Sequence, residues 1–129
     1  MPVLAGSLDL QFSRNIEQFL EILGLSVQPL ELPLQFREGA FCLYLEPQQQ
    51  RLLLTLSYES NAQSTARLLP LLLQRWLPER FQGVMQRIFT LNDTLFISCT
   101  SPEGSQASLW YQLYREQRQL LEQVLQELI

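Results

Sequence analysis

The sequence predicts a single α+β domain of 129 residues, in which helices pack on an antiparallel sheet. Apolar residues recur three and four positions apart in three separate stretches, which is the periodicity of amphipathic helices. Between these stretches apolar and polar residues alternate, as they do in half-buried strands. The resulting element order is α-β-β-β-α-β-β-α. No linker or internal repeat divides the chain, so we expect residues 1–129 to form one domain.

The first helix is expected over residues 13–23, where one apolar face is followed by polar positions. The apolar positions fall at i, i+3, i+4 and i+7: Ile16, Phe19, Leu20 and Leu23. Ser13 or Asn15 can cap the start of this helix, and Gly24 stands where a left-handed residue would end it.

Three strands should follow as an antiparallel meander. Residues 30–36 alternate between apolar and polar side chains, and Pro33 lacks an N–H donor. We therefore expect this strand to lie at a sheet edge or to be only partly paired. Residues 41–46 and 51–58 should form a hairpin, joined by a polar loop of four residues, 47–50.

A central helix is expected within residues 61–77, with Pro70 near the start of its best part and Pro78 at its end. Its apolar residues cover most of the circumference, so both sides of the helix need a cover. We expect one cover to be another subunit; the alternative is a helix wrapped entirely by its own sheet.

A second hairpin and a closing helix complete the chain. The hairpin spans residues 85–100 and turns at Asn92-Asp93, because both residue types tolerate positive φ. The last 23 or so residues should form a long amphipathic helix with leucines on one side and charged residues on the other.

Composition argues for a binding protein rather than an enzyme. The nine basic residues are all arginines, histidine is absent, and the formal net charge is −4. This balance is unfavourable for nucleic acid and for an anionic membrane surface. The lack of histidine removes the usual general base and the commonest metal ligand. No signal peptide and no membrane span are recognisable, so we expect a soluble cytosolic protein.

No catalytic or metal-binding constellation is present in the sequence. Cys42 and Cys99 lie 57 residues apart, match no metal spacing, and sit inside apolar runs, so we expect two buried thiols. A disulfide between them would need an oxidising compartment. Glu38 and Glu46 flank one strand but should be solvated. We therefore assign no catalytic, cofactor-binding or metal residue.

Five segments carry a resemblance that spans residues 16–128. They are the helix end Leu23-Gly24-Leu25, the strand entry Glu38-Gly39-Ala40-Phe41-Cys42-Leu43, the helix Leu68–Leu77, the hairpin Ile88–Thr100 and the closing helix. Together they resemble the class I type III secretion chaperones of the CesT/SycE-like group. The stretch from Pro29 through Leu56 is most similar to a subgroup that works as heterodimers carrying the secretion gatekeeper.

The resemblance implies a non-enzymatic cytoplasmic chaperone of a Gram-negative bacterium, without a cofactor. Such a protein dimerises through its central helix, as a homodimer or with a second small chaperone, and keeps the N-terminal segment of an effector or gatekeeper extended and competent for secretion. The dimer-interface residues expected here are Leu69, Leu72, Leu73 and Trp76. The effector-binding residues expected here are Phe19, Leu23, Leu32 and Leu34, each of which also fits an ordinary core position.

Two other interpretations remain open at this point. A small ligand-binding or enzymatic α+β domain would have an aromatic pocket lined by Tyr44, Tyr58, Phe96 and Trp110. A structural adaptor within a larger secretion assembly would differ from a chaperone only in whether its partner leaves.

Overall fold

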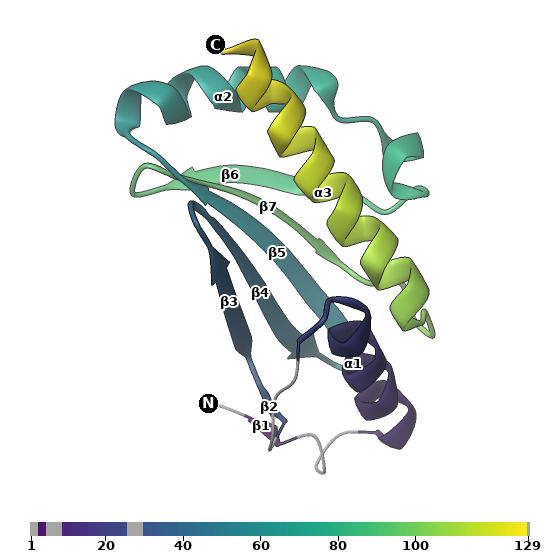
Figure 1. Ribbon diagram of the computed structural model, residues 1–129. Coiled ribbons are helices and arrows are strands. Elements are labelled where there is room, and N and C mark those ends of the chain that lie inside the picture. The colour runs from purple at the N-terminus through teal and green to yellow at the C-terminus, as the bar shows by residue number, and fades with distance from the viewer. Residues whose placement is uncertain (1–2, 5–8, 26–29, 129) are drawn as a thin grey trace.

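The computed structural model describes residues 3–4, 9–25 and 30–128 (Figure 1). The strands are β1 (Val3–Leu4), β2 (Glu31–Leu32), β3 (Leu34–Glu38), β4 (Phe41–Gln48), β5 (Arg51–Glu59), β6 (Arg87–Leu91) and β7 (Thr94–Thr100). The helices are α1 (Leu10–Ile22), α2 (Ala62–Arg75), the 3-10 helix η2 (Pro78–Phe81) and α3 (Ala107–Glu127). The predicted α+β class is confirmed.

The main sheet has five antiparallel strands in the order β3-β4-β5-β7-β6. β3 and β6 are therefore its two edges. Figure 1 shows α3 crossing one face of this sheet diagonally, with α1 beside it on the same face. α2 packs against α3 and against β6 at one end of the sheet.

The core lies between this face of the sheet and the helices. Leucines of β4 and β5 form its floor, among them Leu45, Leu54 and Leu56, which are at most 1% exposed. Trp110 of α3 packs edge-on against Phe12 and Phe19 of α1, with ring centroids 5.7 and 6.1 Å apart. Each such buried side chain contributes about 1.5–3 kcal/mol, so these rings fix how α1 and α3 sit together.

α1 begins earlier than the sequence pattern predicts. The Asp9 carboxylate accepts a hydrogen bond from the Phe12 backbone N–H at 3.2 Å, so Asp9 is the N-cap. Ser13 and Asn15, the predicted caps, lie inside the helix and are buried. The predicted end is confirmed: Gly24 has φ +77°, and Leu25 N–H donates to the Leu20 carbonyl at 2.8 Å, which is a Schellman motif.

The expected strand over residues 30–36 is divided at Pro33. β2 pairs with β1 in a separate two-stranded sheet, whereas β3 pairs with β4 at the edge of the main sheet. The break follows from the missing N–H of Pro33, which cannot continue a ladder. The edge position predicted for this segment is thereby confirmed.

The first hairpin has a tighter turn than expected. β4 runs on to Gln48 and pairs with Arg51, which leaves a two-residue turn at Gln49-Gln50. Both residues have positive φ, 52° and 64°, as a type I′ turn requires. The four-residue loop predicted here is wrong because Pro47 joins the strand beyond the end of β3, where its missing N–H leaves no ladder bond unmade.

α2 lies within the expected residues 61–77, but the place of Pro70 in it differs from the expectation. Asn61 caps it, because its side-chain oxygen accepts from the Ser64 backbone N–H at 2.8 Å. Pro70 therefore lies inside the helix and not near its first turn. The helix ends before Pro78, as predicted, and Pro78 begins η2. The second hairpin turns at Asn92-Asp93 with positive φ at both residues, as predicted.

Candidate functional site

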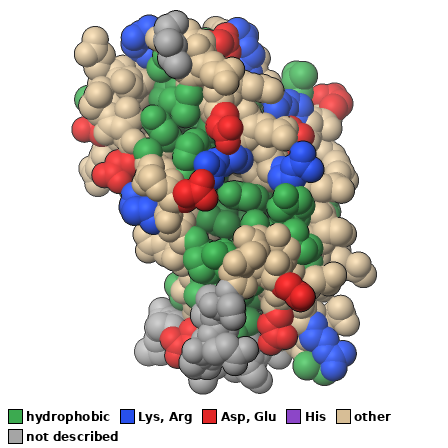
Figure 2. All heavy atoms as spheres, in the orientation of Figure 1, with side chains coloured by type: hydrophobic (Ala, Val, Ile, Leu, Met, Phe, Trp, Pro, Cys, Tyr) green, Lys and Arg blue, Asp and Glu red, His purple; other side chains and the backbone are tan. Residues whose placement is uncertain are grey.

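An apolar groove opens beside the edge strand β3, where the end of α1, strands β3 to β5 and helix α3 meet. It encloses about 310 Å³. Its apolar lining consists of Leu23, Leu25, Phe36, Phe41, Leu43, Leu56 and Tyr114. Figure 2 shows hydrophobic side chains gathered over this part of the molecule, with arginine and acidic side chains among them. We call this hollow the β3 groove.

The residues at the base of the β3 groove are buried, whereas those on its walls are partly exposed. Leu43 and Leu56 are buried at its base, whereas Leu23, Leu25 and Phe36 are only partly covered. Leu23 and Leu25 flank Gly24, so the Schellman motif that ends α1 also places two apolar side chains on the groove wall. The motif that ends α1 thus also forms part of the site.

Arg118 crosses the β3 groove from α3. Its guanidinium carbon lies 4.0 Å from the centroid of the Phe41 ring. Its Nη2 donates to Glu38 at 2.9 Å, at the end of β3, and its Nε donates to Glu122 at 2.8 Å, one turn along α3. Arg118 therefore ties α3 to the β3–β4 turn over an aromatic surface.

The environment of Arg118 favours its charged form. Burial alone lowers the pKa of this guanidinium, but the hydrogen bonds that it donates to Glu38, Glu122 and Tyr114 outweigh burial and raise the pKa above its ordinary value. The groove thus holds a permanent positive charge beside its apolar floor.

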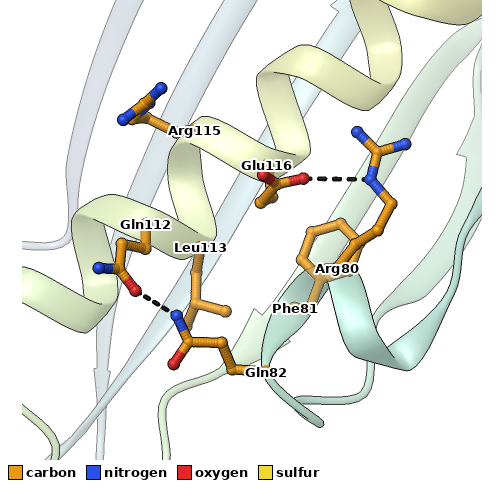
Figure 3. A pocket seen from close by; sticks show the side chains of 7 residues that line it. All are labelled: Arg80, Phe81, Gln82, Gln112, Leu113, Arg115 and Glu116. Atoms are coloured by element: carbon orange, nitrogen blue, oxygen red, sulfur yellow. Dashed lines mark hydrogen bonds and ion pairs between the residues drawn. The ribbon is translucent and has the colours of Figure 1, made fainter.

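A second pocket, of about 350 Å³, lies between η2 and the middle of α3 (Figure 3). Arg80 donates from Nε to Glu116 at 3.1 Å, and the Gln82 amide donates to Gln112. Figure 3 shows both contacts bridging the two elements, with Arg115 directed away from them. These contacts fasten η2 to α3, and they place no base next to a nucleophile.

α2 leaves apolar surface uncovered at the margin of the core. Leu69 and Trp76 are partly exposed and also pack against the core, and Leu73 is 53% exposed. Leu69, Leu73 and Trp76 recur at helical spacing, so they share one side of α2. We call this surface the α2 face. Leu77, which follows it, is 54% exposed.

The expected dimer-interface residues are divided by this geometry. Leu69, Leu73 and Trp76 lie on the α2 face. Leu72 is fully buried in the core of its own chain, so it offers no surface for a second subunit. The hundred-degree turn between neighbouring helix positions accounts for the difference between Leu72 and Leu73.

The expected effector-binding residues are divided in the same way. Phe19 and Leu32 are fully buried, so they offer no accessible surface to a partner. Leu23 lines the β3 groove. Leu34 is partly exposed and lines a smaller pocket of about 250 Å³ on β3 and β4. Sequence periodicity identified the apolar positions but could not separate inward from outward ones.

The four aromatic residues considered for a ligand pocket do not meet. In the β4–β5 register Tyr44 pairs with Thr55, so Tyr44 and Tyr58 point to opposite faces of the sheet. Phe96 lies near Tyr44, with centroids 6.3 Å apart, whereas Trp110 is buried between α1 and α3. No described pocket is lined by this set.

No chemistry of catalysis is assembled in the part of the chain that the structure describes. No group of three or more potential metal ligands occurs among residues 3–4, 9–25 and 30–128. Cys42 and Cys99 are free and buried, as predicted. Burial raises the pKa of the Cys99 thiol to about 11, which keeps it protonated and unreactive at neutral pH. Among the described residues, no helix has the length and apolar character to cross a bilayer.

A buried polar contact lies between α3 and the sheet, near β5, β7 and the start of β6. Gln117, next to Arg118 on α3, donates from its amide to Gln86 at 3.0 Å and is fully buried. Its Nε2 also lies 3.7 Å from the Cys99 sulfur. Gln117 therefore anchors α3 to the sheet at the point where Arg118 turns outward. No periodic signal in the sequence marked this residue as a core position.

The fold and the groove define a small α+β domain with an apolar hollow beside an exposed sheet edge. The sequence model of the SsaM family matches residues 9–124. Over 114 residues the chain is 36% identical to secretion system apparatus protein SsaM of Salmonella typhimurium, which covers 88% of this chain and 93% of that protein. The chain belongs to the SsaM family, and the class I type III secretion chaperone-like family predicted from the sequence is confirmed.

Family membership associates the chain with a type III secretion system. The relative carries the name of a secretion system apparatus protein. Partners related to secretion follow from this membership.

Proposed function

We propose that the chain is a non-enzymatic chaperone that holds an extended segment of a secreted partner in the β3 groove. The observation that carries the proposal is the position of this groove beside β3, which is an edge of the main sheet. An edge strand offers unpaired backbone groups to an added strand, and neighbouring apolar hollows accept its alternate side chains. The partner would be an effector or the gatekeeper of the secretion system.

We also propose that the α2 face is the contact with a second subunit, either another copy or a second small chaperone. Leu73 is half exposed on a helix that buries Leu68 and Leu72 in its own core, and an exposed apolar helix surface favours association. In this proposal the protein works in the cytoplasm of a Gram-negative bacterium, where its acidic charge keeps it soluble.

The groove proposal is tested by replacing one phenylalanine at each edge of the sheet. Phe36→Ser changes the β3 groove, whereas Phe89→Ser changes the opposite edge strand β6, where Phe89 is 42% exposed. Each variant is returned to a host strain lacking the gene, and proteins secreted by its type III system are quantified. We expect Phe36→Ser to abolish secretion of at least one protein and Phe89→Ser to preserve it. Secretion at the wild-type level by a folded Phe36→Ser variant would refute the proposal.

The subunit proposal is tested by light scattering behind size exclusion. A mass of twice 15.1 kDa supports a homodimer. A chain that aggregates alone and is rescued by a second small acidic protein of the same system supports a heterodimer. A stable monomer that needs no partner contradicts the proposal.

A further inference from the structure

The ion pair between Arg118 and Glu38 is unequal in its exposure to solvent. The Arg118 side chain is 24% exposed, whereas the Glu38 side chain is 78% exposed. Arg118 is held from below by the Phe41 ring and along α3 by Glu122. Glu38 thus reaches the guanidinium from the solvent side and can leave while Arg118 remains in place.

The two contacts of Arg118, with Glu38 and with the Phe41 ring, also differ in strength. An ion pair with a solvent-exposed partner contributes little to stability, because water competes for the carboxylate and the side chain must be ordered. The guanidinium is already partly desolvated over an aromatic ring, where it binds an anion more strongly than in water. Glu38 therefore occupies an anion-binding position on Arg118 and is held there only weakly.

Both arginines that line the groove are paired with carboxylates. Arg37 pairs with Glu59 at 3.0 Å, and Arg118 pairs with Glu38 through Nη2 and with Glu122 through Nε. When Glu38 turns to solvent, Nη2 of Arg118 loses its carboxylate next to the Phe41 ring, while Nε keeps Glu122.

We propose that Glu38 is an internal stand-in for a carboxylate of the partner. Given the groove function proposed above, the bound segment carries an Asp or Glu beside its apolar anchor, and this carboxylate replaces Glu38 on Arg118. The apolar anchor occupies the space over Leu43 and Leu56, and the carboxylate fixes the register of the segment. A segment that lacks the acidic group and displaces Glu38 would leave Nη2 of Arg118 without a carboxylate, so such segments should bind less tightly.

The test uses a library of random twelve-residue peptides displayed on phage and selected on the full-length chain. Selected peptides should carry Asp or Glu within two positions of a Leu, Ile, Phe or Met. The tightest peptide is then made with a fluorescent label, together with an analogue in which the acidic residue is Gln. We expect the acidic peptide to bind at least about tenfold tighter than the analogue, as a charged hydrogen bond requires.

Three variants assign this preference to Arg118 and Glu38. Glu38→Gln removes the competitor, so the acidic peptide should bind up to about fivefold tighter. Arg118→Gln should bind the two peptides equally, and Arg118→Lys should retain part of the preference by its charge. Glu127→Gln is the matched control, because it removes one carboxylate from another arginine, Arg75, and should leave both affinities unchanged. Circular dichroism confirms that each variant is folded.

The outcomes separate this inference from the groove function. If selected peptides bind the wild-type chain, fail to bind the Phe36→Ser variant and show no preference for an acidic residue, the role proposed for Glu38 is refuted. The groove function then survives. Enrichment of Lys or Arg beside the anchor, as the net charge of −4 would favour, also overturns it. If Phe36→Ser leaves the binding of every selected peptide unchanged, both the groove function and the stand-in fail.

Discussion

The β3 groove and the α2 face are two apolar surfaces of different shape. The groove is concave, its floor is buried, and an arginine held by two glutamates crosses it. The α2 face is the outer side of a helix, with Leu73 half exposed. A concave strip beside a strand edge suits an extended segment, whereas a convex apolar face suits another folded surface. Apolar exposure alone therefore does not identify the partner; shape and charge do.

The largest loss of stability is expected when a charge is placed at Leu72, which adjoins Leu73 of the α2 face. We expect Leu72→Asp to lower the free energy of unfolding by about 3–5 kcal/mol, because the carboxylate is buried without a partner. Urea denaturation followed by circular dichroism measures the change. Leu73→Asp is the control and should leave the fold intact. A Leu72→Asp chain as stable as the wild type would show that Leu72 is accessible.

The packing of α3 on the sheet is tested by the titration of Cys99, whose sulfur lies 3.7 Å from Nε2 of Gln117. Burial raises the pKa of this thiol to about 11 from an ordinary value of 9.0. Protonation of the folded state therefore contributes stability in full below pH 9, and this contribution is lost as the pH rises toward 11. The expected loss is about 2–3 kcal/mol.

Urea denaturation between pH 8 and pH 10.5 measures this loss against Cys99→Ser, which lacks the thiol. The wild-type chain should lose more stability than the variant over this range. Equal slopes would mean that Cys99 is solvated and that α3 packs loosely on the sheet.

Leu73→Asp tests whether the α2 face is the contact between subunits. We expect the dissociation constant of the subunit complex to rise about 30-fold, the effect of removing a central apolar contact. Sedimentation equilibrium measures it, with Phe36→Ser as a control that changes the groove and spares the interface. An unchanged constant would place the subunit contact elsewhere.

The smallest effect is expected for Glu127→Gln. The Glu127 carboxylate accepts from Arg75 at 2.6 Å beside the α2 face, but both side chains are more than a third exposed. Such a pair contributes little, so the melting temperature should stay within about 2 °C of the wild-type value. A shift above 5 °C in differential scanning calorimetry would show that this pair braces α2 against α3.

Much of the fold could be predicted because local signals and global packing agree. The end of α1 at Gly24 and the turn at Asn92-Asp93 rest on backbone conformations that few residue types adopt. Segments with ambiguous signals were placed less well. Pro70 resembles a helix start, yet it lies within α2 because Asn61 caps the helix and tertiary packing of Leu68 and Leu72 outweighs one lost hydrogen bond.

The candidate site was harder to predict because its parts are distant in the chain. Arg118 and Glu38 are 80 residues apart, and no periodicity relates them. Leu23 was recognised as a candidate because it ends an apolar helix face, but the same pattern also selected Phe19, which is buried. Distinguishing the two requires knowing where α3 lies, which only the three-dimensional arrangement provides.

The adjacent positions of Gln117 and Arg118 on α3 have a kinetic consequence. Since Gln117 is fixed in the core, α3 cannot roll to open the groove without breaking buried contacts. Release of Glu38 from Arg118 needs only side-chain rotation at the surface, which takes picoseconds to nanoseconds. The chain should therefore be ready to bind at every encounter. Association rates should then depend on diffusion and on the partner's own unfolded segment, with no delay from this protein.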